Sequence, residues 1–145
     1  MDVRRFALFA GVQFVLFGVL GFIPGVTQPP AAGAPPLAVD AGYGMLLGLL
    51  PVNILHNLFH VGSGVLALVA SRSFSNARLF ARGLAIVYGL LTVLGLIPGL
   101  NTTFGLIPIY GWDVAYHGVL AAVAAYFGFM ASADTEAHAS SARSR

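Results

Sequence analysis

The stretch VLGFIPGV, residues 19–26, occurs again almost unchanged as VLGLIPGL, residues 93–100. Both copies close an apolar run with Pro-Gly, a pair that ends a helix and starts a turn. The offset of 74 residues between the copies also aligns Arg4 with Arg78. We therefore predict two related helices that run in the same direction.

A second repeat follows each of these helices. GLLP at residues 48–51 matches GLIP at residues 105–108 with an offset of 57. Two helical hairpins with the same direction through a membrane form a parallel repeat, related by a pseudo-twofold axis along the membrane normal. The offset of 57 also aligns two pairs of ionisable residues, which are His56 with Asp113 and His60 with His117.

The composition indicates an integral membrane protein, with the lipid bilayer as its first partner. Hydrophobic residues make up 58% of the 145 residues and charged residues 8%, whereas a soluble domain carries about 25% charged residues. The seven basic residues flank apolar segments, so we interpret them as topology signals and predict no nucleic-acid partner. Because the chain has no cysteine, disulfides, thiolate metal sites and cysteine nucleophiles are excluded.

Four segments are long and apolar enough to cross about 30 Å of hydrocarbon as helices, which needs about 20 residues each. Only a helix satisfies its backbone hydrogen bonds within one such segment. The first apolar run is long for a secretory signal, so we expect it to be retained. The sequence predicts an all-α integral membrane four-helix bundle in residues 1–131, with helices at about 6–23, 51–70, 79–97 and 112–130, outer loops at 24–50 and 98–111, and a short cytoplasmic tail at 132–145.

The arginines predict the orientation of this bundle. They precede the first helix, lie between the second and third, and end the tail, whereas neither outer connection contains Lys or Arg. Positive residues concentrate on the cytoplasmic side of a membrane, so both termini are expected in the cytoplasm.

The long connection at 24–50 is rich in Pro, Ala and Gly, and we expect a flexible outer loop there. Its last part, MLLGLL at residues 45–50, is apolar but short. It is expected either to lie in the membrane interface or to begin the second helix early.

The stretch NILHNLFH, residues 53–60, places polar side chains in this apolar context. Positions three and four apart share one face of a helix, and polar groups facing lipid are costly, so this face should point into the bundle. The fourth predicted helix has a corresponding polar face. The expected polar cluster lies in the outer half of the bilayer and consists of Asn53, His56, Asn57, His60, Asp113 and His117.

Three interpretations of the cluster remain open, and the one we favour is a hydrogen-bonded network that fixes the two hairpins and needs no cofactor. The second is a divalent metal site, such as a zinc site, with His56, His60, Asp113 and His117 as ligands, or a haem b held between His60 and His117. The third is a small transporter or proton relay. An enzyme is not favoured, because no nucleophile turn is recognisable.

The segments GFIPG, LLGLLPVNILHNLFHVGSGVLAL and WDVAYHGVLA together resemble the uncharacterised bacterial membrane family called domain of unknown function 4383. The resemblance implies a small four-pass protein of the bacterial inner membrane, and it supplies no activity. We accordingly expect an accessory or scaffolding protein, with a second copy or another membrane protein as its partner.

Overall fold

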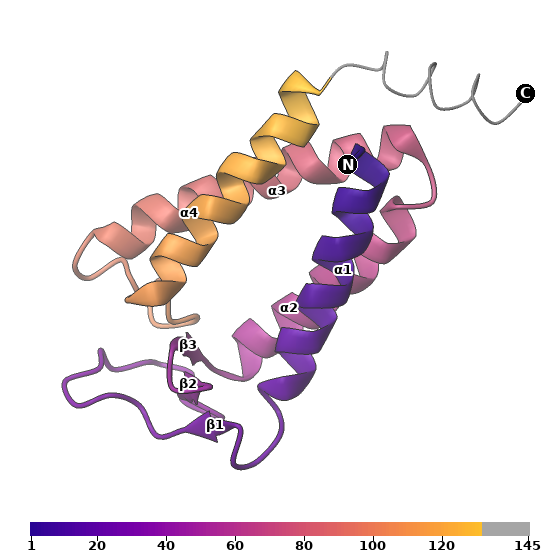
Figure 1. The fold of residues 1–145 in the computed structure, drawn as a ribbon. Helices are drawn as coiled ribbons and strands as arrows, with labels where there is room; N and C mark the ends of the chain where they lie inside the picture. Colours follow the sequence, from indigo (N-terminus) through magenta and orange to yellow (C-terminus); the bar gives the residue numbers. More distant parts are fainter. Residues whose placement is uncertain (132–145) are drawn as a thin grey trace, which may run out of the picture.

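The computed structural model describes residues 1–131, in which four helices and one small sheet occur. The predicted tail at 132–145 lies outside the described residues. The mostly helical architecture is as predicted, whereas the sheet was not predicted. In chain order the elements are α1 (Val3–Leu20), β1 (Thr27–Gln28), β2 (Gly44–Leu46), β3 (Leu50–Val52), α2 (Ile54–Ala70), α3 (Phe74–Leu96), α4 (Trp112–Ala125) and the π-helix η1 (Tyr126–Met130), which continues α4 (Figure 1).

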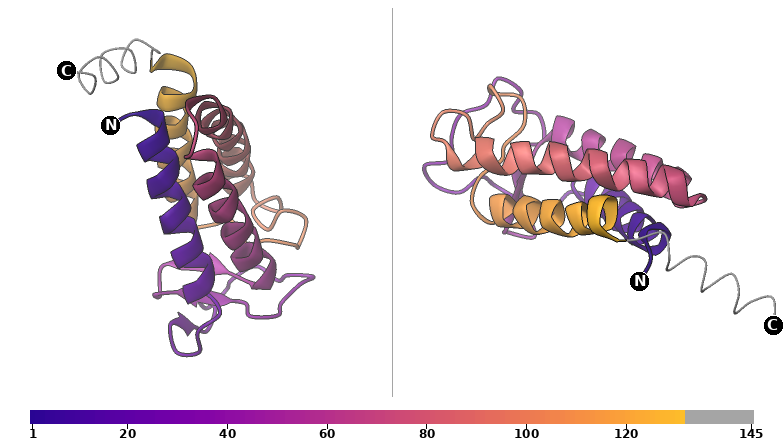
Figure 2. Two further views of the ribbon diagram at one scale, coloured as in Figure 1. Left: turned by 90° about the vertical axis from the view of Figure 1, so that its right-hand side faces the viewer. Right: turned by 90° about the horizontal axis from the view of Figure 1, so that it is seen from above.

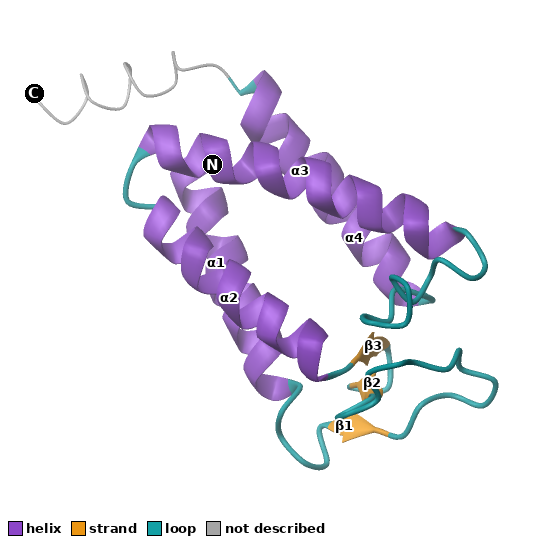
Figure 3. Cartoon of the chain, turned by 180° about the vertical axis from the view of Figure 1, so that it is seen from behind, coloured by secondary structure: helices purple, strands orange, loops and turns teal. Residues whose placement is uncertain are grey.

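The helices form two antiparallel pairs. α1 packs along α2, and α3 packs along α4, with further contacts of α1 and α2 to α3; Figure 2 shows α1 beside α2. The N-terminus, the α2–α3 turn and the end of η1 lie at one end of the molecule, which we call the terminal end (Figure 1). The pairs diverge towards the opposite end, the loop end, where the sheet and the 98–111 connection lie between them (Figure 3).

Three helices begin at side-chain caps, and these caps set boundaries that differ from the predicted ones. Asp2 accepts a hydrogen bond from the Arg5 amide (2.8 Å), so α1 begins at Val3 and not near residue 6. Ser73 accepts one from the Asn76 amide (3.2 Å), so α3 begins at Phe74 and not near residue 79. A capping oxygen satisfies an amide that would otherwise lack a partner, which is why polar residues open these helices.

The expectation of a flexible loop at 24–50 is replaced by an antiparallel sheet with the order β1-β2-β3. The segment MLLGLL supplies most of the β2–β3 hairpin, so it does not start α2. Its turn contains Leu47 and Gly48, both with positive φ (53° and 72°), a conformation that glycine adopts without strain. The hairpin buries Leu46 and Val52, whereas Leu47 and Leu49 in its turn are exposed.

The buried core lies between the two pairs in the half near the terminal end, where apolar side chains of α1, α3 and the end of α4 meet. Large apolar side chains are also exposed around the outside of all four helices. Among residues 1–131, three helices are long and apolar enough to cross a membrane, namely Val3–Leu20, Phe74–Leu96 and Trp112–Met130, and α2 is a shorter apolar helix of 17 residues.

Candidate metal centre

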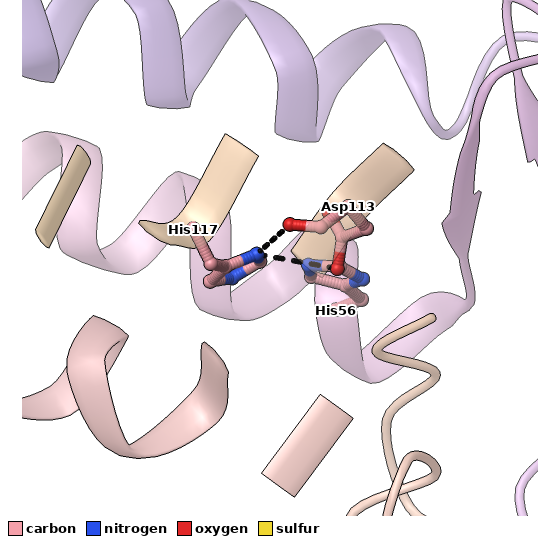
Figure 4. Close-up of side chains that lie close together, drawn as sticks. All are labelled: His56, Asp113 and His117. Carbon is pink, nitrogen blue, oxygen red and sulfur yellow. Dashed lines mark hydrogen bonds and ion pairs between the residues drawn. The ribbon is translucent and has the colours of Figure 1, made fainter. Parts of the chain in front are cut away.

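Three buried ionisable side chains from the two helix pairs meet near the loop end. His56 lies in the first turn of α2, Asp113 lies in the first turn of α4, and His117 lies one turn later. Each residue is at most 2% exposed, and Figure 4 shows the three side chains pointing toward one another. One nitrogen from each imidazole and one carboxylate oxygen lie within 4.8 Å of one another. Two imidazoles and a carboxylate are ligands that divalent transition metals accept.

Both imidazoles of this set are oriented by backbone carbonyls. His56 Nδ1 lies 3.1 Å from the Pro51 carbonyl oxygen, and His117 Nδ1 lies 2.8 Å from the Asp113 carbonyl oxygen. A carbonyl only accepts, so each Nδ1 carries the proton and donates it. The lone pair then sits on Nε2 of each ring. Histidines that bind metals in proteins have this arrangement, in which one nitrogen donates to the protein and the other binds the ion.

The Asp113 carboxylate has no comparable partner. Its Oδ2 lies 3.3 Å from His117 Nδ1, but that proton is directed to the Asp113 carbonyl, and Oδ2 accepts no hydrogen bond within residues 1–131. The N-terminal position on α4 offsets part of its charge through the helix dipole. A buried carboxylate with so little compensation is suited to a cation.

Other polar atoms around this set also lack partners. The buried atoms without a hydrogen bond in the described part of the chain are Asn57 Oδ1 and Nδ2, His60 Nδ1 and Nε2, Tyr88 OH, Tyr116 OH and Asp113 Oδ2. Each unmet buried donor or acceptor costs about 1–3 kcal/mol.

Five rings, one or more from each helix, form a closed circuit in which four contacts are stacked and the His56–His117 contact is tilted. In order they are Phe14, His60, His56, His117 and Tyr88, with centroid separations of 5.6, 4.5, 6.1 and 4.5 Å and 5.5 Å from Tyr88 back to Phe14. Interplanar angles of 22–37° show that the rings lie roughly face to face. The circuit fixes the imidazole planes and excludes water from their faces.

The structure places the two predicted asparagines outside the metal-ligand group. Asn53 precedes α2 in extended backbone, where its Oδ1 caps the His56 amide at 2.9 Å, because Pro51 and Val52 belong to β3 and the helix starts at Ile54. The Asn57 side chain lies against Gly21, the residue that follows α1, where a side chain on that residue would collide with it. Neither asparagine bonds to a histidine side chain.

His60 lies one turn below His56 and is not among the three residues whose ligand atoms converge. Its ring is covered by His56 and Phe14. A haem between His60 and His117 would need a slot as wide as a porphyrin, yet His56 is in ring contact with both residues and Tyr88 stacks on His117. The residues present therefore do not fit a haem.

The two outer connections close the loop end above the site. Asn53 Nδ2 donates to the Val39 carbonyl (2.8 Å) and the Leu106 carbonyl (2.7 Å), and so joins both connections to the start of α2. The Tyr43 and Tyr110 hydroxyls lie 3.0 Å apart. Burial and this hydrogen bond raise the pKa of Tyr110 above its ordinary value, so its hydroxyl remains a donor at physiological pH.

Sequence reasoning missed three aromatic residues that pack around the polar cluster, Phe14, Tyr88 and Tyr116. Tyr88 stacks on His117, and the Tyr116 ring meets the same imidazole edge to face at 5.9 Å. The repeat contained a usable signal, because Phe14 and Tyr88 are separated by the same 74 residues as the two Pro-Gly motifs.

A comparison with protein families gives a match to the model described as Domain of unknown function (DUF4383) over residues 4–130. The match confirms the resemblance noted in the sequence. No curated protein and no solved structure matches the chain.

Proposed function

Because the chain belongs to the DUF4383 family, whose description states no function, we propose a function from the site itself. The protein is a multi-pass protein of the bacterial inner membrane, built from two repeated helical hairpins. It binds one divalent transition metal ion at His56, Asp113 and His117. The ion links the hairpins and gives the protein an accessory or scaffolding role.

Membrane insertion is supported by the lengths and surfaces of the helices. Val3–Leu20, Phe74–Leu96 and Trp112–Met130 have mean hydropathies of 1.6, 1.9 and 1.3 over their best windows. α2 has 17 residues, which span about 26 Å at 1.5 Å each, and β3 extends the chain beyond it. The exposed apolar side chains would face lipid, where they need no protein partner.

Arginines at the terminal end support a cytoplasmic location of both chain ends. Reporter fusions after Ser73 and after the last residue should both give cytoplasmic signals, and a fusion at Gly33 in the long outer connection should give a periplasmic one. A periplasmic signal from either of the first two fusions would contradict the orientation.

The repeat is supported by hydrogen bonds that correspond under the two offsets. Arg4 Nε donates to the Ser71 carbonyl at 3.1 Å, and Arg78 Nε donates to the Gly128 carbonyl at 3.1 Å. The donors are 74 residues apart and the acceptors 57. Two hairpins that shared no common design would not be expected to reproduce a contact at both offsets.

Ring contacts correspond in the same way. Phe14 stacks on His60, and the residues at the corresponding offsets, Tyr88 and His117, also stack. The contact between Phe14 and Tyr88 then lies where a pseudo-twofold axis would pass. Under this symmetry the polar residues of both hairpins converge on one central site.

The observation that carries metal binding is the shared orientation of the two imidazoles, each with Nδ1 held by a carbonyl. Two ligand atoms bound to the same zinc ion at 2.0–2.2 Å lie about 3.4 Å apart, so the three side chains, whose ligand atoms lie within 4.8 Å of one another, would have to draw closer to hold an ion. An unpaired buried carboxylate costs several kcal/mol, and a divalent cation would remove that cost at Asp113. Three protein ligands leave a fourth coordination position for water or a partner's side chain.

Linking α2 to α4 is the mechanical consequence of this site. Each helix packs along its own hairpin partner, and the two meet mainly through the side chains of the site. An ion bound to His56 on one side and to Asp113 and His117 on the other would join them directly. This supports a scaffolding role, because the ion would tie the two hairpins together near the loop end.

Metal analysis of the purified wild-type protein tests this proposal. Protein isolated in detergent without chelator should carry about one zinc ion per chain by mass spectrometry. Removing the ion with EDTA should lower the thermal midpoint by roughly 5–10 °C, because saturation at 100 times the dissociation constant adds about 2.7 kcal/mol of stability. Re-adding zinc should restore the midpoint. Protein that holds no metal and does not respond to zinc, cobalt(II) or iron(II) would refute metal binding.

A further inference from the structure

A groove of about 650 Å³ runs along the outside of the molecule between α2 and α3. We call it the α2–α3 groove. Its walls are almost wholly apolar, and Tyr88, which stacks on His117, lines its deep end. The polar side chains Asn76 and Arg82 line it on the N-terminal half of α3, which lies at the terminal end. The groove is therefore apolar along its length and polar at one end.

The dimensions of the groove match one leaflet of a bilayer. Asn76 and Tyr88 both line it and are 12 positions apart on one helix, which corresponds to about 18 Å. One leaflet contributes about 15 Å of hydrocarbon. With the terminal end in the cytoplasm, the polar end would lie at the headgroups of the inner leaflet and the deep end near the midplane.

Positive charge dominates the polar end of the groove. Arg82 is exposed and lines the groove, and Arg72, which is also exposed, lies in the α2–α3 turn. Arg82 donates Nε–H to the Gly128 carbonyl at 2.8 Å, and its guanidinium lies over the Phe129 ring at 5.4 Å. Neither arginine pairs with a carboxylate within residues 1–131. The Nη groups of Arg82 can therefore bind an anion, and a guanidinium binds phosphate through two parallel hydrogen bonds.

We propose that the α2–α3 groove binds an anionic glycerophospholipid, with an acyl chain along the apolar walls and the phosphate at Arg82 and Asn76. The proposal rests on the membrane insertion proposed above and is independent of the metal ion. Charge complementarity and leaflet length favour this occupant over a peptide or a second copy of the chain. Because Tyr88 lines the groove and also stacks on His117, the lipid site and the candidate metal centre share a wall.

Native mass spectrometry of the full chain in detergent, titrated with lipid, tests the proposal. Phosphatidylglycerol should bind with a stoichiometry of one, and phosphatidylcholine with the same acyl chains should bind about tenfold more weakly. Arg82→Gln should weaken the binding of phosphatidylglycerol by about tenfold or more, since a hydrogen bond to a charged group is worth about 1.5–3 kcal/mol. Gly83→Leu should weaken the binding of both lipids, because Gly83 lines the groove and a leucine side chain there would occupy its open space.

Two matched variants control for general effects. Arg5→Gln removes one exposed arginine outside the groove, and Gly89→Leu adds the same side chain at another open glycine of α3 outside it. Both should bind phosphatidylglycerol like the wild type.

Equal binding of the two lipids, or an equal loss of phosphatidylglycerol binding in Arg82→Gln and Arg5→Gln, would overturn the proposal. The proposal would also be overturned if inorganic phosphate competed as effectively as the lipid, because the groove would then be a simple anion site. Failure of membrane insertion is detected separately, because alkaline washing would then release the wild-type chain from membranes.

Discussion

Replacing His117 with alanine is expected to remove the bound metal and to weaken zinc affinity by more than about 100-fold. Removing a group that only orients a metal ligand lowers the metal affinity about 10- to 100-fold, and His117 is itself one of the three candidate ligands. His56→Ala should have an effect of similar size. Competition with a chromophoric chelator gives the affinity, and elemental analysis gives the bound metal.

His60→Ala is the matched control for this loss. It removes a second buried imidazole from α2, stacked on the first at 4.5 Å, but His60 lies outside the converging set. We expect it to keep about one zinc ion per chain. Circular dichroism should show the same helix content in all three variants. Equal loss of metal in His60→Ala and His117→Ala would mean that the three assigned residues are not the ligand set.

The convergence of His56 with Asp113 could be anticipated from the sequence, because the 57-residue offset aligns them and symmetry brings aligned residues toward a common axis. The separation of His60 from the ligand set could not. Helical spacing puts His56 and His60 on one face, but it does not say which residue reaches across to α4. That depends on tertiary packing, in which the His56 ring contacts His117 of α4 while the His60 ring stacks on Phe14 of α1.

The role of Asn53 was also beyond the sequence pattern. Its spacing to His56 and Asn57 fits one helical face, and an apolar run surrounds it. The pairing of Val52 with Gly44 extends β3 to the residue directly before Asn53, so Asn53 becomes the cap of α2. Strand pairing between segments this short depends on tertiary contacts, and local propensity carries little of it.

The close approach of α1 and α2 leads to the second large effect, at Gly64. A Cβ on Gly64 would lie 2.7 Å from the Val15 backbone nitrogen and 2.9 Å from the Gly11 carbonyl oxygen. Backbone atoms of a helix cannot move aside singly, so Gly64→Leu should force the two helices apart. Overpacking typically costs about 1–3 kcal/mol, and a collision with backbone belongs at the upper end of that range. We expect the thermal midpoint in detergent to fall by roughly 6–12 °C.

Gly62→Leu separates this packing effect from the general effect of a larger side chain. Gly62 is on the same helix, two residues earlier, and a Cβ there would meet no atom within 4 Å. Leucine at this exposed position should be neutral or slightly stabilising, because glycine weakens a helix interior by up to about 1 kcal/mol.

Gly11 and Gly64 correspond to Ala85 and Ala121 of the second hairpin, at offsets of 74 and 57. Gly64→Ala should therefore cost less than Gly64→Leu, because an alanine pair is accommodated at the equivalent crossing. If Gly64→Leu melted at the same temperature as Gly62→Leu, the close approach of α1 to α2 would not be a determinant of stability.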